Sequence, residues 1–325
     1  MNRYIGVDLG GTNLRAAIVD TTSGEFTHLK KVPAQAHEGH DAVMARMANL
    51  VNQVITASDL DKSEIGGIGI GVPGVLDLDR GVVLFLPNLP GTWPNVPLKK
   101  TIEASTGLRT QILNDVRSMT FAEWTFGAGR GVDTIACFAV GTGIGGGLVI
   151  NGSLHLGIGG TGGELGHQII DMNGPSCGCG SRGCLEAFAS GPAIAAMGVK
   201  AVMQGLTTTI GERVNYDLNR ITTKVIAEAA LDGDEIANEI YDTAGFYIGI
   251  AVSNVLASVG PRKVVIGGGV AQAGELLLDP IRRTVMERVH IMPVEQVEIA
   301  PAELGTNAGM IGAALWAKTR SPGNG

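Results

Sequence analysis

The sequence predicts an α/β protein of two domains. Strand-like and helix-like segments alternate along the chain, which is typical of an α/β architecture. The length of 325 residues suits two domains of about 150 residues each. An apolar strand, a glycine-threonine turn and a second strand also occur twice, about 130 residues apart, at residues 4–20 and 136–150. We therefore expect a duplicated α/β unit, with two glycine turns facing each other across a cleft.

The first half of the chain predicts four strands and three helices. Strands at residues 4–9 and 14–20 are joined by a Gly-Gly-Thr-Asn turn. Apolar side chains recur at helical spacing over residues 41–58, which predicts an amphipathic helix. A glycine-interrupted strand, a short helix that stops at Gly107, another strand and another helix follow, at residues 65–72, 98–105, 108–113 and 116–125.

The second half predicts the repeated strand pair and three further helices. The strands are expected at residues 136–140 and 147–150. The longest helix should cover residues 234–259, where an apolar stripe recurs every three or four positions. A short strand at 263–266 leads into three glycines and a helix from about residue 275. An Ala-rich helix at 307–318 and a frayed tail at 321–325 end the chain.

The composition narrows the classes of function. Lys and Arg number 24 against 31 Asp and Glu, a formal net charge of −7. This balance argues against a nucleic-acid or anionic-membrane partner, because both require a basic face. Hydrophobic residues make up 45% and charged residues only 17%, so the chain can bury a large core. No targeting or membrane-spanning segment is evident, and the expected location is the cytoplasm.

Three glycine-rich turns follow apolar strands, at residues 10–12, 141–147 and 267–269. Backbone N–H groups in such turns can converge on an anion because no Cβ blocks its approach, and Thr12 and Thr142 add hydroxyl donors. A helix after the third turn would add its N-terminal dipole. An ordinary hairpin is the alternative for each turn alone, but the three together favour a polyphosphate site. The spacing is neither that of a P-loop nor that of a Rossmann fingerprint.

Acidic side chains stand beside these strands. Asp8 lies within an otherwise apolar strand, where it would hold Mg²⁺ through water or else cap the turn. Asn114 and Asp115 follow strand 108–113, and the carboxyl end of a strand in an open sheet faces the ligand crevice. Asp115, ionised at a helix N-terminus, could accept a proton from a substrate hydroxyl. The alternative is that the pair only caps the helix, and the spacing does not distinguish the two.

The most specific stretch of the chain runs from Glu164 to Glu186. It offers one imidazole and three thiolates for a tetrahedral Zn²⁺ site: His167, Cys177, Cys179 and Cys184. A chance cluster or a disulfide pair is the alternative, which the spacing and a reducing compartment disfavour. A fully ligated zinc is structural, so we expect it to fix Glu164 and Glu186, whose carboxylates could accept hydrogen bonds from sugar hydroxyls.

At these residues the sequence resembles the ROK family (repressors, open reading frames and sugar kinases), and within it the ATP-dependent glucokinases of bacteria. The likeness covers essentially the whole chain. The motifs that carry it are Asp8-x-Gly-Gly-Thr12, Gly71-Val-Pro-Gly74, Asn114-Asp115, Gly141-Thr-Gly143, Glu164-x-Gly-His167, Cys177-x-Cys-Gly-x-x-Gly-Cys-x-Glu186 and Gly267-Gly-Gly269. The cysteine-glycine motif is the most specific of them.

The resemblance implies an actin-like (ribonuclease H-like) ATPase fold, with two α/β domains around a central cleft. The small domain would comprise residues 1–113, with the C-terminal helix 307–325 returning to it. The large domain would comprise residues 114–306 and carry the zinc motif. The family also implies an oligomer, a dimer or a dimer of dimers.

The resemblance further implies roles for individual residues. Asp115 would be the general base on the 6-hydroxyl of the sugar. The other expected sugar contacts are Gly71, Gly74, Asn114, Glu164, His167 and Glu186. The residues expected around ATP and its Mg²⁺ are Asp8, Gly10, Gly11, Thr12, Asn13, Gly141, Thr142, Gly143, Gly267, Gly268 and Gly269.

The implied activity is ATP-dependent phosphorylation of glucose to glucose 6-phosphate. The segment 87–98 favours glucose, but another hexose (N-acetylglucosamine, N-acetylmannosamine, mannose or fructose) is the alternative substrate. A polyphosphate donor is disfavoured by the acidic balance. A sugar-sensing repressor is disfavoured by the negative charge, by Asp115 and by a first strand that begins near Arg3. One departure from the family is Arg117, because relatives often continue Asn-Asp with Ala-Asn-Ala.

Overall fold

The computed structural model describes residues 1–86 and 93–321. These residues form two compact units, each assembled from separate stretches of the chain. The first unit contains residues 1–131, 154–163 and 304–325, and the second contains residues 132–153 and 164–303. We predicted a boundary before Asn114, whereas the first unit extends to Gly131. The predicted tail beyond residue 321 and residues 87–92 of the segment that favoured glucose lie outside the described residues.

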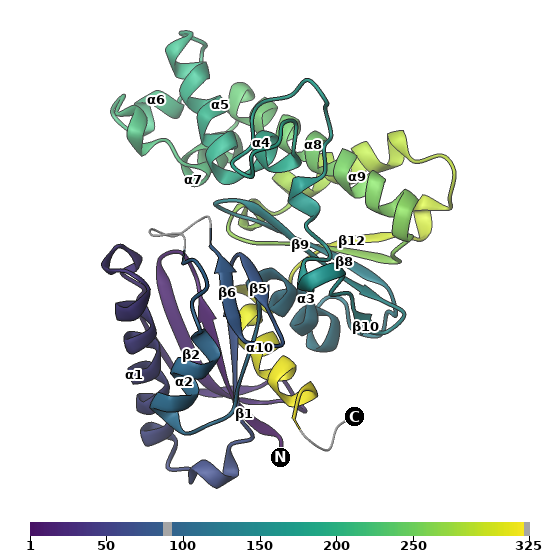
Figure 1. Cartoon of the computed structure of the whole chain (residues 1–325). Coiled ribbons are helices and arrows are strands. Elements are labelled where there is room, and N and C mark those ends of the chain that lie inside the picture. Colours follow the sequence, from purple (N-terminus) through teal and green to yellow (C-terminus); the bar gives the residue numbers. More distant parts are fainter. Residues whose placement is uncertain (87–92, 322–325) are drawn as a thin grey trace. The chain divides into compact units, whose positions relative to one another are not determined.

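A five-stranded mixed sheet forms the centre of the first unit (Figure 1). Strands β1 and β2 form the predicted hairpin, and β1, β4 and β7 run parallel. The sheet order is β3-β2-β1-β4-β7. The strand bounds are β1 Arg3–Leu9, β2 Asn13–Asp20, β3 Phe26–Pro33, β4 Ile68–Val72 and β7 Thr110–Asn114.

Helices cover both faces of this sheet, as the alternation of side chains along β1 requires. Ile5, Val7 and Leu9 pack in one core cluster with helices α1 (His40–Ser58) and α2 (Leu98–Thr106). Tyr4 points to the other face, where α10 (Ala308–Thr319) and α3 (Asp115–Phe126) pack together. The unit is therefore a three-layer sandwich in which strands such as β1 and β4 are buried on both sides.

Glycines in the sheet allow the C-terminal helix to approach it closely. A Cβ at Gly6 would lie 2.1 Å from the carbonyl oxygen of Met310, and one at Gly69 would lie 1.7 Å from that of Ala313. Any larger residue at either strand position would push α10 away. The two glycines, which lack a Cβ, thus explain how a helix from the end of the chain packs on the first strand.

The second unit repeats the topology of the first. Its sheet order is β10-β9-β8-β11-β12, in which β8 and β9 form a hairpin and β8, β11 and β12 run parallel. The bounds are β8 Ile135–Val140, β9 Ile144–Ile150, β10 Ser153–Leu154, β11 Lys263–Gly267 and β12 Glu298–Pro301. Each unit thus has a hairpin followed by two parallel strands in the same order, which confirms the predicted duplication.

Four helices of the second unit, α4, α5, α7 and α9, pack against the long helix α8 (Glu235–Val259), which matches the helix predicted over 234–259. Its length and apolar composition alone would suit a membrane span, but its buried stripe packs within the core of the unit. We therefore interpret it as a core helix. The others are α4 Leu185–Ala189, α5 Gly191–Met203, α6 Ile210–Arg213, α7 Thr223–Leu231 and α9 Glu275–Arg288.

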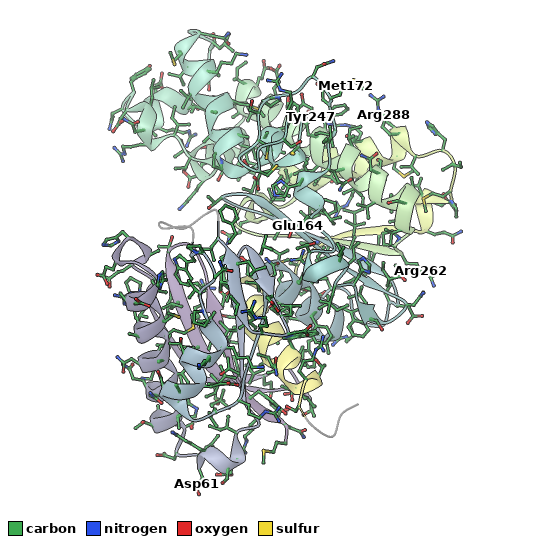
Figure 2. The ribbon with its side chains drawn as sticks, in the orientation of Figure 1. Asp61, Glu164, Met172, Tyr247, Arg262 and Arg288 are labelled. Atoms are coloured by element: carbon green, nitrogen blue, oxygen red, sulfur yellow. The ribbon has the colours of Figure 1, made fainter. Side chains whose placement is uncertain are left out.

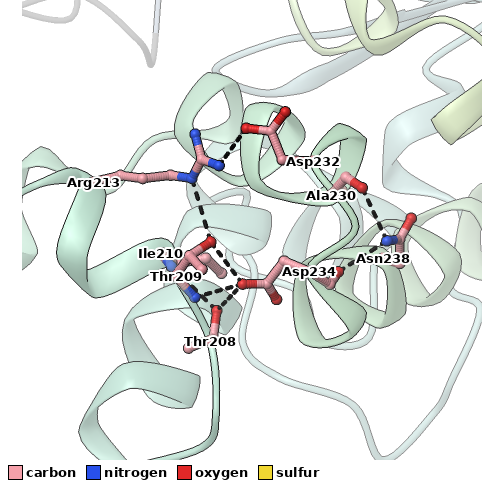
Figure 3. Close-up of polar contacts among 8 residues, drawn as sticks. All are labelled: Thr208, Thr209, Ile210, Arg213, Ala230, Asp232, Asp234 and Asn238. Atoms are coloured by element: carbon pink, nitrogen blue, oxygen red, sulfur yellow. Dashed lines mark hydrogen bonds and ion pairs between the residues drawn. The ribbon is translucent and has the colours of Figure 1, made fainter.

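A polar clamp fixes the start of α8. Asp234 is the N-cap residue, and one of its carboxylate oxygens accepts from the amide of Ala237 at 3.0 Å. Its other oxygen accepts from the hydroxyls of Thr208 and Thr209, both at 2.9 Å (Figure 3). Burial opposes ionisation, but these hydrogen bonds prevail and lower the pKa of Asp234. The clamp joins the 208–209 turn to the core helix.

Side chains on the outer surface of α8 form an aromatic group. Tyr247, labelled in Figure 2, lies against Phe188 with ring centroids 4.4 Å apart. The guanidinium of Arg288, on α9, lies 5.6 Å from the ring centroid of Phe246. Helix α4, which carries Phe188, is thereby packed on α8. The residue before this short helix is Cys184, so the contact helps to fix the end of the cysteine motif.

Candidate active site

The carboxyl ends of three parallel strands bring the polar residues of the first unit together. In register, Asp8 of β1 is paired with Gly71 of β4, and Val72 of β4 is paired with Asn114 of β7. Asn114 also donates from Nδ2 to the carbonyl of Gly74, at 3.4 Å. Asp8, Gly71, Gly74 and Asn114 are thus neighbours at one sheet edge, the position at which open α/β sheets bind ligands.

Of the pair Asn114 and Asp115, it is Asn114 that caps the following helix. Asn114 caps α3, because its Oδ1 accepts from the amides of Val116 at 3.1 Å and Arg117 at 3.2 Å. Asp115 is the first residue of the helix, and its Oδ1 accepts from the amide of Val116 at 2.9 Å. Its carboxylate therefore lies at the positive end of α3, which favours the ionised form.

Asp8 is held in a strongly perturbed environment. Burial and, to a smaller extent, the negative charge of Asp115 raise its pKa to about 7, although the guanidinium of Arg15 acts in the opposite direction. A Cβ at Gly309 would lie 2.8 Å from Oδ1 of Asp8, so only glycine allows the start of α10 to come this close. Carboxylate oxygens are ligands that Mg²⁺ prefers, and a cation here would favour the ionised form.

Arg15 is a site residue that our sequence analysis missed. It lies directly opposite Asp8 in the hairpin register, and its guanidinium donates to the carbonyl of Thr306 just before α10. The signal was available, because a turn at residues 10–13 pairs Leu9 with Leu14 and therefore Asp8 with Arg15.

The first two glycine turns are hairpin turns. In the first, the amide of Gly10 donates to the carbonyl of Asn13 at 2.9 Å, and Gly11 and Thr12 are exposed. In the second, the amide of Gly141 donates to the carbonyl of Gly143 at 2.8 Å. The hairpin alternative is thus correct for their backbone. Both turns lie at the surface ends of buried strands, so this geometry leaves a phosphate-binding role open.

The third turn differs from the sequence prediction in one respect. Gly268 has a φ of +89°, and a Cβ there would lie 2.3 Å from the carbonyl oxygen of Val140. This close approach joins the turn to the end of β8. The residues that follow form a short 3-10 helix, Val270–Ala273, before α9 begins at Glu275. The sequence did not predict this 3-10 helix, whereas the helix predicted from about residue 275 matches α9.

Glu186 connects the second glycine turn to the cysteine motif. Its Oε2 accepts from the amide of Ile144 at 2.9 Å, and a Cβ at Gly143 would lie only 2.3 Å from the same oxygen. Its Oε1 lies 3.8 Å from Sγ of Cys177. The sequence predicted Glu186 as a sugar contact and did not predict these ties. They fix the carboxylate from both sides.

The four predicted zinc ligands lie together in the second unit. One possible ligand atom from each of His167, Cys177, Cys179 and Cys184 lies within 4.8 Å of all the others. The Sγ atoms of Cys179 and Cys184 are 3.8 Å apart, and Sγ of Cys177 lies 3.7 Å from Nδ1 of His167. Zinc–sulfur bonds of about 2.3 Å in a tetrahedron place sulfur atoms about 3.8 Å apart. The residues therefore fit a zinc ion.

The backbone around the cluster is tightly turned. The amide of Cys177 donates to the carbonyl of Ser181 at 2.8 Å, and that of Gly183 donates to the carbonyl of Pro175 at 2.8 Å. Gly183 has a φ of +73°, which favours glycine. Glu164, labelled in Figure 2, is exposed and directly precedes the short 3-10 helix Leu165–His167. The same turn thus carries a proposed sugar contact and a predicted zinc ligand.

Comparisons with known proteins show which family and which fold the chain resembles. The model of the ROK family matches residues 4–320. A glucokinase of Thermotoga maritima is 37% identical over 99% of both chains. The crystal structure of a ROK family glucokinase from Streptomyces griseus, in complex with glucose and AMPPNP, superposes with a TM-score of 0.83 at 32% identity. It covers 98% of this chain and 99% of that one.

A transcriptional regulator is also similar. The structure of a ROK family regulator, a homologue of the E. coli MLC protein, superposes with a TM-score of 0.84 at 29% identity. The likeness covers 97% of this chain and 78% of the regulator. Together these likenesses confirm the predicted actin-like ATPase fold.

Proposed function

The chain belongs to the ROK family, and we propose that it is a glucokinase that transfers the γ-phosphoryl group of ATP to the 6-hydroxyl of glucose. The observation that carries the proposal is the sheet edge at which Asp8, Asn114 and Asp115 meet. The similarity to glucokinases over nearly the full chain supports it. The expected cytoplasmic location and oligomeric assembly belong to the same proposal.

Asp115 is the proposed general base. An ionised carboxylate at the N-terminus of α3 can accept the proton of the 6-hydroxyl as its oxygen attacks phosphorus. In phosphoryl transfer the protein does little covalent chemistry, so alignment of the two substrates matters most. Asn114 supports this alignment, because it caps the helix and also bonds the carbonyl of Gly74.

The remaining proposed sugar contacts are Gly71, Gly74 and Asn114, at the carboxyl ends of the first sheet, and Glu164, His167 and Glu186, in and beside the cysteine motif. The ties of Glu186 to Ile144 and Cys177 support a preorganised hydrogen-bond acceptor, which needs no reorganisation when the sugar binds.

The glycine turns are proposed to hold the ATP phosphates. The first turn contributes Gly10, Gly11, Thr12 and Asn13; the second contributes Gly141, Thr142 and Gly143. Gly267, Gly268 and Gly269 would approach the nucleotide. Asp8 would hold Mg²⁺ through water, and the bound ion would neutralise phosphoryl charge. Arg15, opposite Asp8, places a further positive charge beside the first turn.

A structural zinc ion is proposed at His167, Cys177, Cys179 and Cys184. With four protein ligands the ion has no open position, so it would take no part in the reaction. Its contribution would be to fix the chain between Glu164 and Glu186. The contact of Cys177 with Glu186 supports this link between the metal and the sugar site.

The test is ADP release by the purified protein with Mg-ATP and each of five sugars: glucose, mannose, fructose, N-acetylglucosamine and N-acetylmannosamine. We expect the highest kcat/KM with glucose. A higher value with an N-acetyl sugar would retain the kinase and replace its substrate. No ADP release with any sugar would overturn the proposal that the protein is an ATP-dependent kinase. It would favour either a polyphosphate donor or a sugar sensor like the similar regulator.

A further inference from the structure

We propose that Arg117 is a positioning residue that holds the loop before Glu164 in the conformation needed for sugar binding. The inference rests on the proposed function, since Glu164 is itself a proposed sugar contact. Arg117 is the third residue of α3, two positions after the proposed base. It is also the position at which the sequence departs from the family pattern.

The burial of Arg117 is unusual for its residue type. The residue is 1% exposed, whereas arginine is almost never fully buried unless it is paired. Its Nε donates to the carbonyl oxygen of Gly162 at 2.7 Å, and both residues lie within the first unit. A charge-assisted hydrogen bond of this length is strong, particularly where its donor is buried.

The segment that Arg117 holds is rich in glycine and needs an anchor. Between residues 157 and 163, four glycines have positive φ values: Gly157, Gly159, Gly160 and Gly163. Such a segment loses more conformational entropy on ordering than one of other residues. Ile158 at its tip is 91% exposed, so apolar packing there contributes little to its order.

Two hydrogen bonds hold Gly162 within this loop. The amide of Gly162 donates to the carbonyl of Leu156 at 2.6 Å, which closes the loop on itself. The guanidinium of Arg117 bonds the carbonyl of the same glycine from outside. Glu164 is only two residues further along the chain. The position of Gly162 therefore limits the positions that Glu164 can take.

The same helical turn also carries the proposed base. The amide of Arg117 donates to Oδ1 of Asn114, the cap that sets the start of α3 and hence the place of Asp115. Arg117 thus makes two contacts. Its backbone amide bonds the cap of the turn that carries Asp115, and its guanidinium bonds the loop that leads to Glu164. Lysine could retain the charge but not the geometry of the Nε–H donor.

The test uses the full chain with Arg117→Met, which removes the donor and retains much of the volume, and Arg117→Lys. The matched control is Arg282→Met, because Arg282 also donates from Nε to a backbone carbonyl, that of Ile299 at 3.1 Å, away from the proposed site. Three quantities are measured: thermal stability, hydrogen exchange of the amides of residues 158–164 without ligand, and KM for glucose and for ATP.

For Arg117→Met we expect loop amides that exchange about tenfold faster and a KM for glucose about tenfold higher, with a smaller change in the KM for ATP. Arg117→Lys should restore part of both losses. Arg282→Met should lower thermal stability alone. Unchanged loop exchange in Arg117→Met, or an equal rise in the KM for glucose in Arg282→Met, would overturn the inference.

The loop measurement keeps this inference separate from the proposed function. If the wild-type protein does not phosphorylate glucose, the proposed function fails. Faster exchange of residues 158–164 in Arg117→Met would then still support the anchoring of the loop, and unchanged exchange would still contradict it.

Discussion

Asp8 and Arg15 face each other across the first hairpin, where β1 and β2 pair them in register. Burial and the negative charge of Asp115 both disfavour the ionised form of Asp8, whereas the positive charge of Arg15 favours it. A buried acid with a cation on one side and a second acid nearby can change its protonation when another charge arrives. We therefore expect the proposed Mg²⁺ to favour the ionised form of Asp8.

The first prediction concerns pH and the stability of the ligand-free protein. The pKa of Asp8 is about 7 in the folded state, against 3.8 for the ordinary group, so the folded protein retains a proton that the unfolded chain releases. The ionisation of Asp8 therefore lowers the free energy of unfolding as the pH rises from about 4 to about 7, by at most about 4 kcal/mol. Asp8→Asn should remove this dependence and be more stable than the wild type at neutral pH.

Urea unfolding without nucleotide or Mg²⁺, at several pH values, measures this effect. Asp59→Asn is the control, because Asp59 is exposed in the left-handed conformation after α1, which asparagine also tolerates. An Asp8→Asn variant that is less stable than the wild type at pH 7 and above would contradict the assigned environment of Asp8.

The second prediction concerns the clamp at the start of α8. Because the pKa of Asp234 is lowered, its stabilising contribution is present above the ordinary pKa and is lost as the pH falls through the folded value. Asp234→Ala should cost about 1–2 kcal/mol at neutral pH, since it removes an N-cap and the bonds to Thr208 and Thr209. The difference from the wild type should shrink in acid.

Thermal unfolding at pH 7 and pH 3 checks this result. Asp232→Asn is the matched control, since Asp232 makes only an exposed ion pair with Arg213 in the same region (Figure 3). Such a pair contributes about 0–1 kcal/mol. Equal losses of thermal stability in the two variants would contradict a stabilising role for the hydrogen bonds of Asp234.

The third prediction concerns the metal. The wild type should contain one zinc ion per chain, and Cys177→Ser should contain much less, because one of four ligands is weakened. Since Cys177 also contacts Glu186, the KM for glucose should rise more than the KM for ATP. Metal analysis by mass spectrometry and steady-state kinetics measure both effects. Cys137→Ala, in β8 and outside the cluster, should retain the zinc; a full zinc content in Cys177→Ser would contradict the site.

Much of this arrangement could be predicted from the sequence because it depends on local patterns. The hairpin at Gly10 to Asn13, helix α1 and helix α8 follow from turn chemistry and apolar periodicity. Our sequence analysis did not identify β3, because most of its residues are exposed and polar at the edge of the sheet. The four zinc ligands were recognisable from the spacing of their residue types.

The relationships between distant residues could not be predicted in this way. A lone arginine in a helix resembles a surface residue, so the burial of Arg117 depends on the loop that covers it. The tie between Glu186 and Ile144 depends on how a short helix packs on a hairpin. Helix α3 belongs to the first unit because it packs on α10, which begins about 180 residues after α3 ends.

The most direct test of the central claim is ADP release with Mg-ATP and glucose by the wild type and Asp115→Asn, each checked for intact fold and zinc content. Asp59→Asn serves as the control for an aspartate far from the proposed chemistry. We predict that kcat falls at least about 100-fold in Asp115→Asn and is unchanged in the control. A kcat in Asp115→Asn within a few fold of the wild type would contradict the assignment of Asp115 as the base and the mechanism built on it.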